Sequence, residues 1–187
     1  VVIRAALSRE PECLTEFSLL HLIAHTPDME PVMRPHAREV DEMAVLMEEH
    51  REELFVPPPT EWEDRVAYEE FLGEIKTAFV LQSWIDEMSE EALLDRFGVQ
   101  PGDLYKVIEN AKWLLYAVHE LSRLLGCTVV LPLTAELIER VAKGVKKELL
   151  PIVKLEGVGR VRGRILYNAG YKTIEDIKHA PLEELTN

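Results

Sequence analysis

The chain contains 187 residues, of which 47% are hydrophobic and 29% are charged, and its formal net charge is −13. These values are typical of a soluble globular protein of one or two domains, and no apolar run approaches the length of a membrane span. The negative charge excludes binding to nucleic acid through a broad basic surface, because that mode needs many lysine and arginine side chains along the phosphates.

Helical periodicity, with recognisable start and stop residues, covers almost the whole chain and predicts an all-α fold. The predicted helices cover residues 1–9, 16–25, 35–55, 60–79, 89–98 and 101–126, and a further helix opens at Thr134. Thr60 with Glu63 predicts the capping box of one long helix, and Ser89 and Gly98 predict the start and stop of another. Only residues 128–133 have a strand-like composition.

One face of the helix over residues 101–126 is apolar. At about 100° per residue, the expected core face consists of Leu104, Val107, Ile108, Ala111, Leu114, Leu115, Val118, Leu121 and Leu125. Trp113 lies nearly opposite this face, in line with Lys106 and Asn110. An indole can stack on a nucleobase while a lysine pairs with the adjacent phosphate, so this line predicts a contact surface. The alternative is that another helix of the bundle covers Trp113.

The C-terminal region is locally basic, with ten Lys and Arg against seven Asp and Glu from Glu139 onward, whereas the preceding chain has eleven against twenty-seven. Its predicted elements are a helix over residues 146–155, a Gly157-Val158-Gly159 turn, a helix that stops at Gly170, and a short helix with a capping box of Thr173 and Asp176. Glycine lets a ligand approach the backbone, and a helix start offers unpaired N–H groups at the positive end of its dipole.

Three arginines follow this turn: Arg160, Arg162 and Arg164. Together with the turn they predict a site for one phosphate. The pattern resembles the helix-hairpin-helix family of DNA-backbone binders, which hold phosphate oxygens without reading bases. The alternative is a turn whose glycines merely let two helices pack, and such a turn would not need the arginines.

Four stretches carry a wider resemblance: LLHLIAHTPDME, WIDEMSEEALLDRFGVQPGDL, NAKWLLYAVHELSRLLG and GVKKELLPIVKLEGVGRVRGRILYNAG. Together they resemble the C-terminal part of the archaeal Hjm-type DNA-repair helicases, superfamily-two, Ski-two-like enzymes that act on stalled forks. The resemblance implies a helical ratchet bundle over residues 1–144, followed by a small helix-hairpin-helix module, truncated, over residues 145–187.

The same resemblance implies roles for individual residues. A basic residue and a tryptophan on the long helix hold the bases of translocating single-stranded DNA, and these roles fall on Lys106 and Trp113, although many family members carry arginine at the first position. A brake or gate at the strand exit is assigned to Gly157, Val158, Gly159, Arg160 and Arg162. The implied partners are single-stranded or forked DNA and the motor domains of the same parent chain.

The chain lacks a GxxxxGK[ST] phosphate loop and a DExx carboxylate pair. We therefore expect no catalytic residue and no cofactor here, while the resemblance implies ATP and Mg²⁺ for the parent helicase. Because the chain begins with valine and stops in mid-pattern, we expect a piece of a longer protein. Arg4, Arg9 and Glu10 interrupt the apolar N-terminus, and only two cysteines, Cys13 and Cys127, are present, which favours an intracellular, cytoplasmic protein. Association with the nucleoid is what the resemblance to DNA-repair helicases implies.

Two further interpretations come from other classes of protein. His21 and His25 have the i, i+4 spacing of a metal-dependent hydrolase, but Leu22 occupies the place of a catalytic glutamate, so we expect a partly buried structural histidine and no metal. An acidic helical scaffold for protein interactions is the other alternative, and it would present an apolar patch without a basic rim. Trp62 and Trp84 have apolar neighbours and are expected in the core or at a domain contact.

Overall fold

The computed structural model describes residues 14–180, so the helix predicted over residues 1–9 and Cys13 lie outside the described part. Its α-helices are α2 (Glu16–Ala24), α3 (Val40–Glu49), α4 (Arg65–Ile85), α5 (Glu90–Phe97), α6 (Pro101–Leu124), α7 (Leu131–Lys143), α8 (Arg160–Asn168) and α9 (Ile174–His179). Short 3-10 turns are η2 (Arg51–Glu53), η3 (Thr128–Val130), η4 (Lys147–Leu149) and η5 (Ile152–Lys154). Every regular element within these residues is helical, which confirms the all-α prediction.

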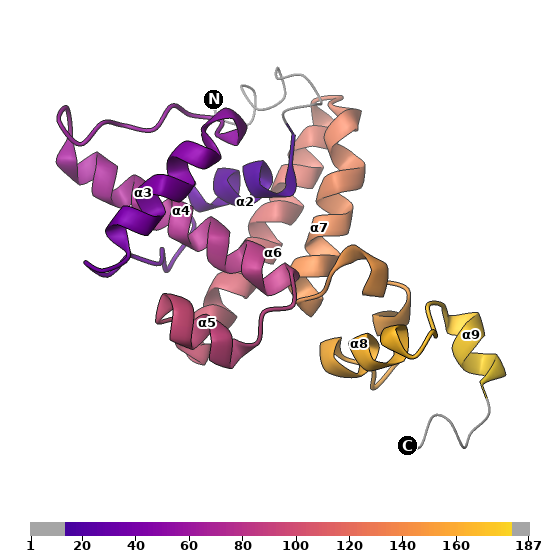
Figure 1. Ribbon diagram of the computed structural model, residues 1–187. Helices are drawn as coiled ribbons and strands as arrows, with labels where there is room; N and C mark the ends of the chain where they lie inside the picture. Colours follow the sequence, from indigo (N-terminus) through magenta and orange to yellow (C-terminus); the bar gives the residue numbers. More distant parts are fainter. Residues whose placement is uncertain (1–13, 181–187) are drawn as a thin grey trace.

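Helices α2 to α7 form a bundle around one hydrophobic core (Figure 1). Helix α2 packs against α4, and α7 packs along α6. Every residue of α2 from Phe17 to Ala24 is buried, as expected for a helix that is apolar on all sides. This arrangement leaves one side of α6 free to face solvent.

A second, smaller cluster of buried side chains lies beyond the bundle. Val145, Leu149, Ile152 and Val153 form its centre, and side chains from α8 and α9 pack against them. In Figure 1 these two helices lie together at the C-terminal end of the molecule, beside the bundle. The larger cluster ends at Val141 and the smaller one begins at Val145, so the two divide near Gly144. Residues 145–180 are called the hairpin module below.

Local capping signals placed several helix ends correctly. The Ser89 hydroxyl accepts a hydrogen bond from the Ala92 amide at the start of α5, and Gly98 ends that helix with a φ of +66°. The predicted capping box at α9 is also present, because Thr173 and Asp176 each accept a hydrogen bond from the other's backbone amide.

Two predicted helices begin later than expected, and of the two only α3 is also shorter. Helix α4 begins after Asp64, whose carboxylate accepts from the Ala67 amide at 3.0 Å, so Thr60 does not start it. Helix α3 begins only at Val40, because Glu39 is held by a buried ion pair with Lys76 (2.7 Å) from α4. In both cases the residue just before the observed start, Glu39 or Asp64, makes a contact that sets where the helix begins.

Two stretches were assigned the wrong conformation. Residues 128–133 form η3 and the first turn of α7, where Pro132 is tolerated because a first-turn N–H has no helical partner. Residues 146–155 form η4 and η5 in place of one α-helix. Pro151 has no N–H to donate to the Lys147 carbonyl, which accepts from Leu150 at 3.1 Å.

The apolar face of α6 ends earlier than predicted. Its seven residues from Leu104 to Val118 are buried, but Leu121 and Leu125 are exposed. Ser122 is buried in their place, near the middle of the buried stripe, and its hydroxyl donates to the Val118 carbonyl at 2.7 Å. A hydroxyl that is satisfied within its own helix can be buried at little cost.

Candidate nucleic-acid interface

Trp113 lies on the open side of α6, and its side chain is 58% exposed. No helix of residues 14–180 covers it, so the alternative in which the bundle encloses this indole is not what the structure shows. Lys106, two helical turns earlier, is also exposed. The two side chains therefore share one solvent-facing side of α6.

The basic side chains on this side of α6 have acidic partners in the same helix. Lys106 Nζ lies 3.4 Å from Asp103 Oδ1, and Lys112 Nζ lies 2.8 Å from Glu109 Oε1. Near the end of α6, Arg123 repeats the pattern with Glu120 at 2.6 Å. Exposed ion pairs of this kind contribute little to stability, so a phosphate can replace the carboxylate at small cost.

Asn110 is partly buried, and its side-chain amide donates to the Glu30 carbonyl. This hydrogen bond attaches the segment between α2 and α3 to α6. Beside it, a cavity of about 780 Å³ is lined by basic and acidic side chains, among them Arg34, Lys106 and Glu70. Because its charges are mixed, the cavity does not by itself favour an anion.

Two aromatic residues on the exposed side of α6 were missed by the sequence analysis. Tyr105 and Tyr116 are more than half exposed, and they lie on one line of the helix that runs beside Trp113. Their eleven-residue separation corresponds to about 20° on a helical wheel. The helical wheel that places Trp113 away from the core face also places both tyrosines outside that face, so they could have been predicted in the same way.

The Gly157-Val158-Gly159 turn is exposed at the start of α8. Gly157 has a φ of +79°, and Gly159 is the N-terminal cap of α8 in an extended conformation, with no side-chain cap. Nothing lies within 4 Å of the position that a Cβ would take at either glycine. The close packing assumed in the alternative interpretation is therefore absent at these two positions, and the first amides of α8 have no capping side chain.

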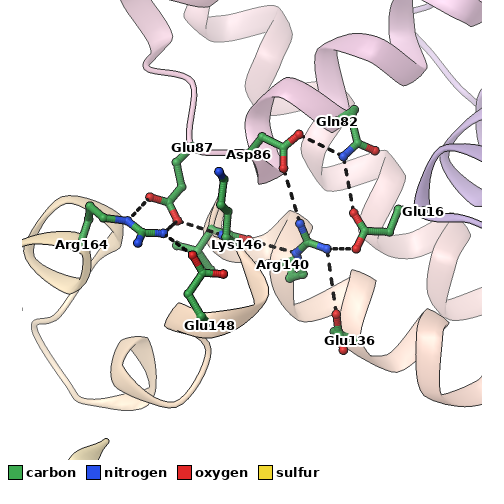
Figure 2. Close-up of polar contacts among 10 residues, drawn as sticks. Glu16, Gln82, Asp86, Glu87, Glu136, Arg140, Lys146, Glu148 and Arg164 are labelled. Atoms are coloured by element: carbon green, nitrogen blue, oxygen red, sulfur yellow. Dashed lines mark hydrogen bonds and ion pairs between the residues drawn. The ribbon is translucent and has the colours of Figure 1, made fainter. Parts of the chain in front are cut away.

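The arginines of α8 have different partners. Arg162 is exposed and donates to the Gly157 carbonyl at 2.9 Å, within the turn itself. Arg160 donates to the Met88 carbonyl at 2.7 Å, and its guanidinium lies 4.2 Å from the centre of the Trp84 ring. Arg164 forms ion pairs with Glu87 (2.6 Å) and Glu148 (2.9 Å), as Figure 2 shows. Two of the three arginines thus pack the hairpin module, contrary to the premise that packing would not need them.

The tryptophans outside α6 divide between one confirmed and one wrong expectation. Trp84 is buried, and its indole N–H donates to the Val141 carbonyl at 2.8 Å. Trp62 is 94% exposed, because it lies in the turn before α4 and not within the helix predicted there. Its immediate neighbours in the sequence, Glu61, Glu63 and Asp64, are acidic, so the expectation of a core or domain-contact tryptophan was wrong for Trp62.

His21 and His25 meet one carboxylate, that of Glu74. His25 Nδ1 lies 2.8 Å from Glu74 Oε2, and the fully buried His21 lies 3.6 Å from the same atom. Burial, reinforced by the charge of His25, lowers the pKa of His21 from 6.5 to about 3, which makes this histidine a neutral core residue. Among residues 14–180 no group of three or more His, Cys or acidic side chains could hold a metal ion.

Comparison with known proteins places these features in a family. The family model described as "Archaeal helicase, domain 4" matches residues 17–144, which include α6. The protein "ATP-dependent DNA helicase Hel308" of Thermococcus kodakarensis is 38% identical over 181 residues, which are 96% of this chain and 16% of the relative. The Hel308 of Methanocella arvoryzae is 37% identical over 171 residues, 90% of this chain and 23% of the relative.

A third relative, the Hel308 of Caldivirga maquilingensis, is 50% identical over 122 residues, 64% of this chain and 16% of the relative. The chain spans less than a quarter of the length of these curated relatives. In the part of the chain that the structure describes, no helix is both long enough and apolar enough to cross a membrane. Since the family model covers more than two thirds of its residues, the chain belongs to the archaeal helicase domain 4 family, with similarity to helicases of the Hel308 type.

Proposed function

We propose that this chain is a non-catalytic region of an ATP-dependent DNA helicase that contacts translocating single-stranded DNA. The exposure of Trp113 on α6, in line with Lys106, carries this proposal. A large aromatic surface left open to water is costly, and it becomes favourable when a nucleobase stacks on it. Base stacking tolerates any sequence, as a translocating helicase requires.

Lys106 holds a phosphate beside the stacked base. Its carboxylate partner, Asp103, is exposed, so a phosphate oxygen can take over the ammonium group without a buried charge being left unpaired. Asn110, Tyr105 and Tyr116 extend the same surface, Asn110 by the amide hydrogen that the Glu30 carbonyl does not use. The chain as a whole is acidic, so binding depends on these few contacts.

The Gly157-Val158-Gly159 turn holds a second phosphate through the first amides of α8. The uncapped N–H groups and the open space around both glycines support this assignment. Arg162 lies beside the turn and adds a guanidinium. Arg160 contributes its backbone amide, because its side chain is occupied by Trp84 and Met88.

The names of the relatives, each an ATP-dependent DNA helicase, support a wider setting for this proposal. The motor domains of the parent chain bind ATP and Mg²⁺, and residues 1–144 act as the ratchet that the strand passes. Residues 145–187 act as a brake or gate where the strand exits. The parent enzyme acts in the nucleoid on stalled replication forks during DNA repair.

Two exposed tryptophans provide a matched test. Trp113→Ala in the intact helicase is expected to weaken binding to a single-stranded oligonucleotide by about 1–3 kcal/mol. Trp62→Ala removes an even more exposed indole that is not on α6, and it should leave affinity unchanged. Fluorescence anisotropy with a labelled oligonucleotide measures both. Equal affinities for the parent and Trp113→Ala would refute the stacking role.

A second candidate function is contact with another protein surface. Leu121, Leu124, Leu125 and Val129 are exposed together at the far end of α6 and the turn that follows it. The motor domains of the parent chain are the partner proposed for this patch. In the intact helicase, Leu124→Asp should lower the melting temperature of the motor domains without changing oligonucleotide affinity, and an unchanged melting temperature would remove this candidate.

A further inference from the structure

The turn after α4 contacts both the bundle and the hairpin module. Asp86 Oδ1 lies 3.8 Å from Arg140 Nη2 of α7, and the adjacent residue Glu87 accepts from Arg164 of α8 at 2.6 and 2.7 Å. Figure 2 shows the two carboxylates directed at the two different guanidinium groups. Two consecutive residues therefore connect elements on opposite sides of the boundary near Gly144.

One peptide unit lies between these contacts, the unit that joins Val145 and Lys146. Arg140 Nε donates to the Val145 carbonyl at 3.2 Å, and the Lys146 amide donates to Glu87 Oε1 at 3.0 Å. The carbonyl and the amide belong to the same planar peptide. A guanidinium and a carboxylate therefore fix its orientation from two edges, immediately after α7 ends at Gly144.

The Glu87 carboxylate is itself firmly held. Its backbone has a φ of +72°, which a non-glycine residue adopts only when its surroundings favour that conformation. Burial alone would raise the pKa of Glu87, but the hydrogen bonds from Arg164 and the Lys146 amide hold that pKa below its ordinary value. Arg164 is also paired with Glu148, and this second ion pair holds the guanidinium in place beside Glu87.

A second contact supports the same junction. The Trp84 ring at the end of α4 lies under the Arg160 guanidinium, and a Cβ at Gly144 would stand 2.5 Å from Trp84 Cζ2. The chain can therefore pass this ring only with glycine at position 144. Both the polar and the aromatic contacts hold the segment after α7 against the end of α4.

We propose that Glu87 is a positioning residue which, with Arg140 and Arg164, clamps the Val145–Lys146 peptide and fixes the angle between bundle and hairpin module. The consequence for binding rests on the proposed function. With the angle fixed, Trp113 on α6 and the glycine turn of α8 stay at a constant separation. A strand that reaches both sites then binds the second at a high effective concentration, which a loose joint would lower.

A distance measurement without DNA tests the clamp. Spin labels are attached through Tyr116→Cys and Ile165→Cys, both exposed positions on α6 and α8, after the native cysteines are replaced by serine. The labelled protein with Glu87 intact should give one narrow distance distribution, and Glu87→Gln should broaden or shift that distribution. Glu91→Gln, which removes the same charge from an exposed position on α5, should leave it narrow.

A second variant keeps the test decisive if Glu87→Gln unfolds the chain, which circular dichroism would reveal. Arg164→Lys retains the positive charge but cannot bridge Glu87 and Glu148 with a rigid fork, so it should broaden the distribution as well. Distributions as narrow and as centred as the parent's in whichever of these variants is folded would overturn the clamp.

Binding to DNA tests the positioning role separately. In the intact helicase, Glu87→Gln should lower the affinity for a long oligonucleotide that spans both sites by about tenfold. The affinity for a short oligonucleotide that reaches only α6 should be unchanged. Equal weakening of both lengths, or of neither, would overturn the positioning role. If the parent helicase binds neither length, the proposed function fails, whereas the result from the spin labels still decides the clamp.

Discussion

Helices α6 and α8 both carry basic side chains where the sequence predicts contacts with DNA, but they use them differently. On α6, Lys106 and Lys112 pair with acidic residues of their own helix and stay at the surface. On α8, Arg160 and Arg164 reach across to the turn after α4. A basic residue with an acid one turn earlier in its own helix remains available to a ligand. One whose partners lie in another element becomes part of the structure.

The largest expected effect is a loss of stability in acid, and it arises in the bundle, from His21, and not in the hairpin module. Because the pKa of His21 is lowered from 6.5 to about 3, the unfolded chain takes up a proton that the folded bundle refuses. This contribution to stability is complete above pH 6.5 and decreases progressively as the pH falls toward about 3. We expect a loss of about 4 kcal/mol over this range, measured from urea unfolding at a series of pH values.

Two groups act differently in the same titration. The hydrogen bond to Glu74 raises the pKa of His25, so its contribution is present below pH 6.5 and is lost as the pH rises through the folded value. Glu87 has a lowered pKa, so the junction weakens only below the ordinary value of 4.5. The variant His21→Leu should flatten the decline between pH 6.5 and about 3, and a decline as steep as the parent's would contradict the assignment.

Two glycines distinguish packing from ligand contact. Gly144→Ala puts a Cβ 2.5 Å from Trp84 Cζ2 at a φ of +62°, and we expect it to lower the free energy of unfolding by about 3 kcal/mol. Gly159→Ala has open space and a negative φ, so it should change stability by less than about 0.5 kcal/mol. Denaturant melts of the two variants compare them directly, and similar losses would remove the distinction.

Two arginines of α8 should separate in the same way. Arg164→Ala leaves Glu87 without its main partner and is expected to cost about 2 kcal/mol of stability. Arg162→Ala touches only the Gly157 carbonyl, so it should leave the melting temperature unchanged while weakening oligonucleotide binding. The difference between α6 and α8 would have to be abandoned if Arg162→Ala proved the more destabilising of the two.

The smallest expected effect concerns Lys106. Lys106→Ala should reduce the salt dependence of oligonucleotide binding by about one phosphate contact and change stability by less than about 0.5 kcal/mol. Lys178→Ala is the matched control, because Lys178 also pairs with an acid three residues earlier but lies on α9. Identical salt slopes for the two variants would indicate that Lys106 makes no phosphate contact.

Local chemistry explains which parts of the fold could be predicted. The ends of α5 and the capping box of α9 depend on residues within four positions of each other, so Ser89, Gly98 and Thr173 were read correctly. The start of α3 depends on Glu39 meeting Lys76 from another helix, which no local pattern contains. The two 3-10 turns around Pro151 could have been predicted, because a proline has no N–H for an α-helical hydrogen bond, but the helical periodicity of the segment pointed to a single α-helix.

The candidate site divides along the same line. The helical wheel placed Trp113 on the open side of α6, because the side of one helix is set by its own sequence. The same wheel could not tell where the apolar face of α6 ends, since the burial of Ser122 and the exposure of Leu121 depend on neighbouring helices. The Met88 carbonyl that Arg160 contacts and the Glu87 carboxylate that Arg164 contacts lie more than seventy residues away in the sequence, so no local pattern could predict these structural contacts.

The acid one turn before each lysine on the open side of α6 has a consequence for movement. Under the proposed function, the Lys106 ammonium returns to Asp103 when a phosphate leaves it, so neither charged group is left without a counterion. Release then replaces one exposed pair by another of similar energy, so the barrier to letting go stays low. A surface of this kind favours short-lived phosphate contacts over long-lived ones, which suits a strand that moves along the protein better than one that stays bound in place.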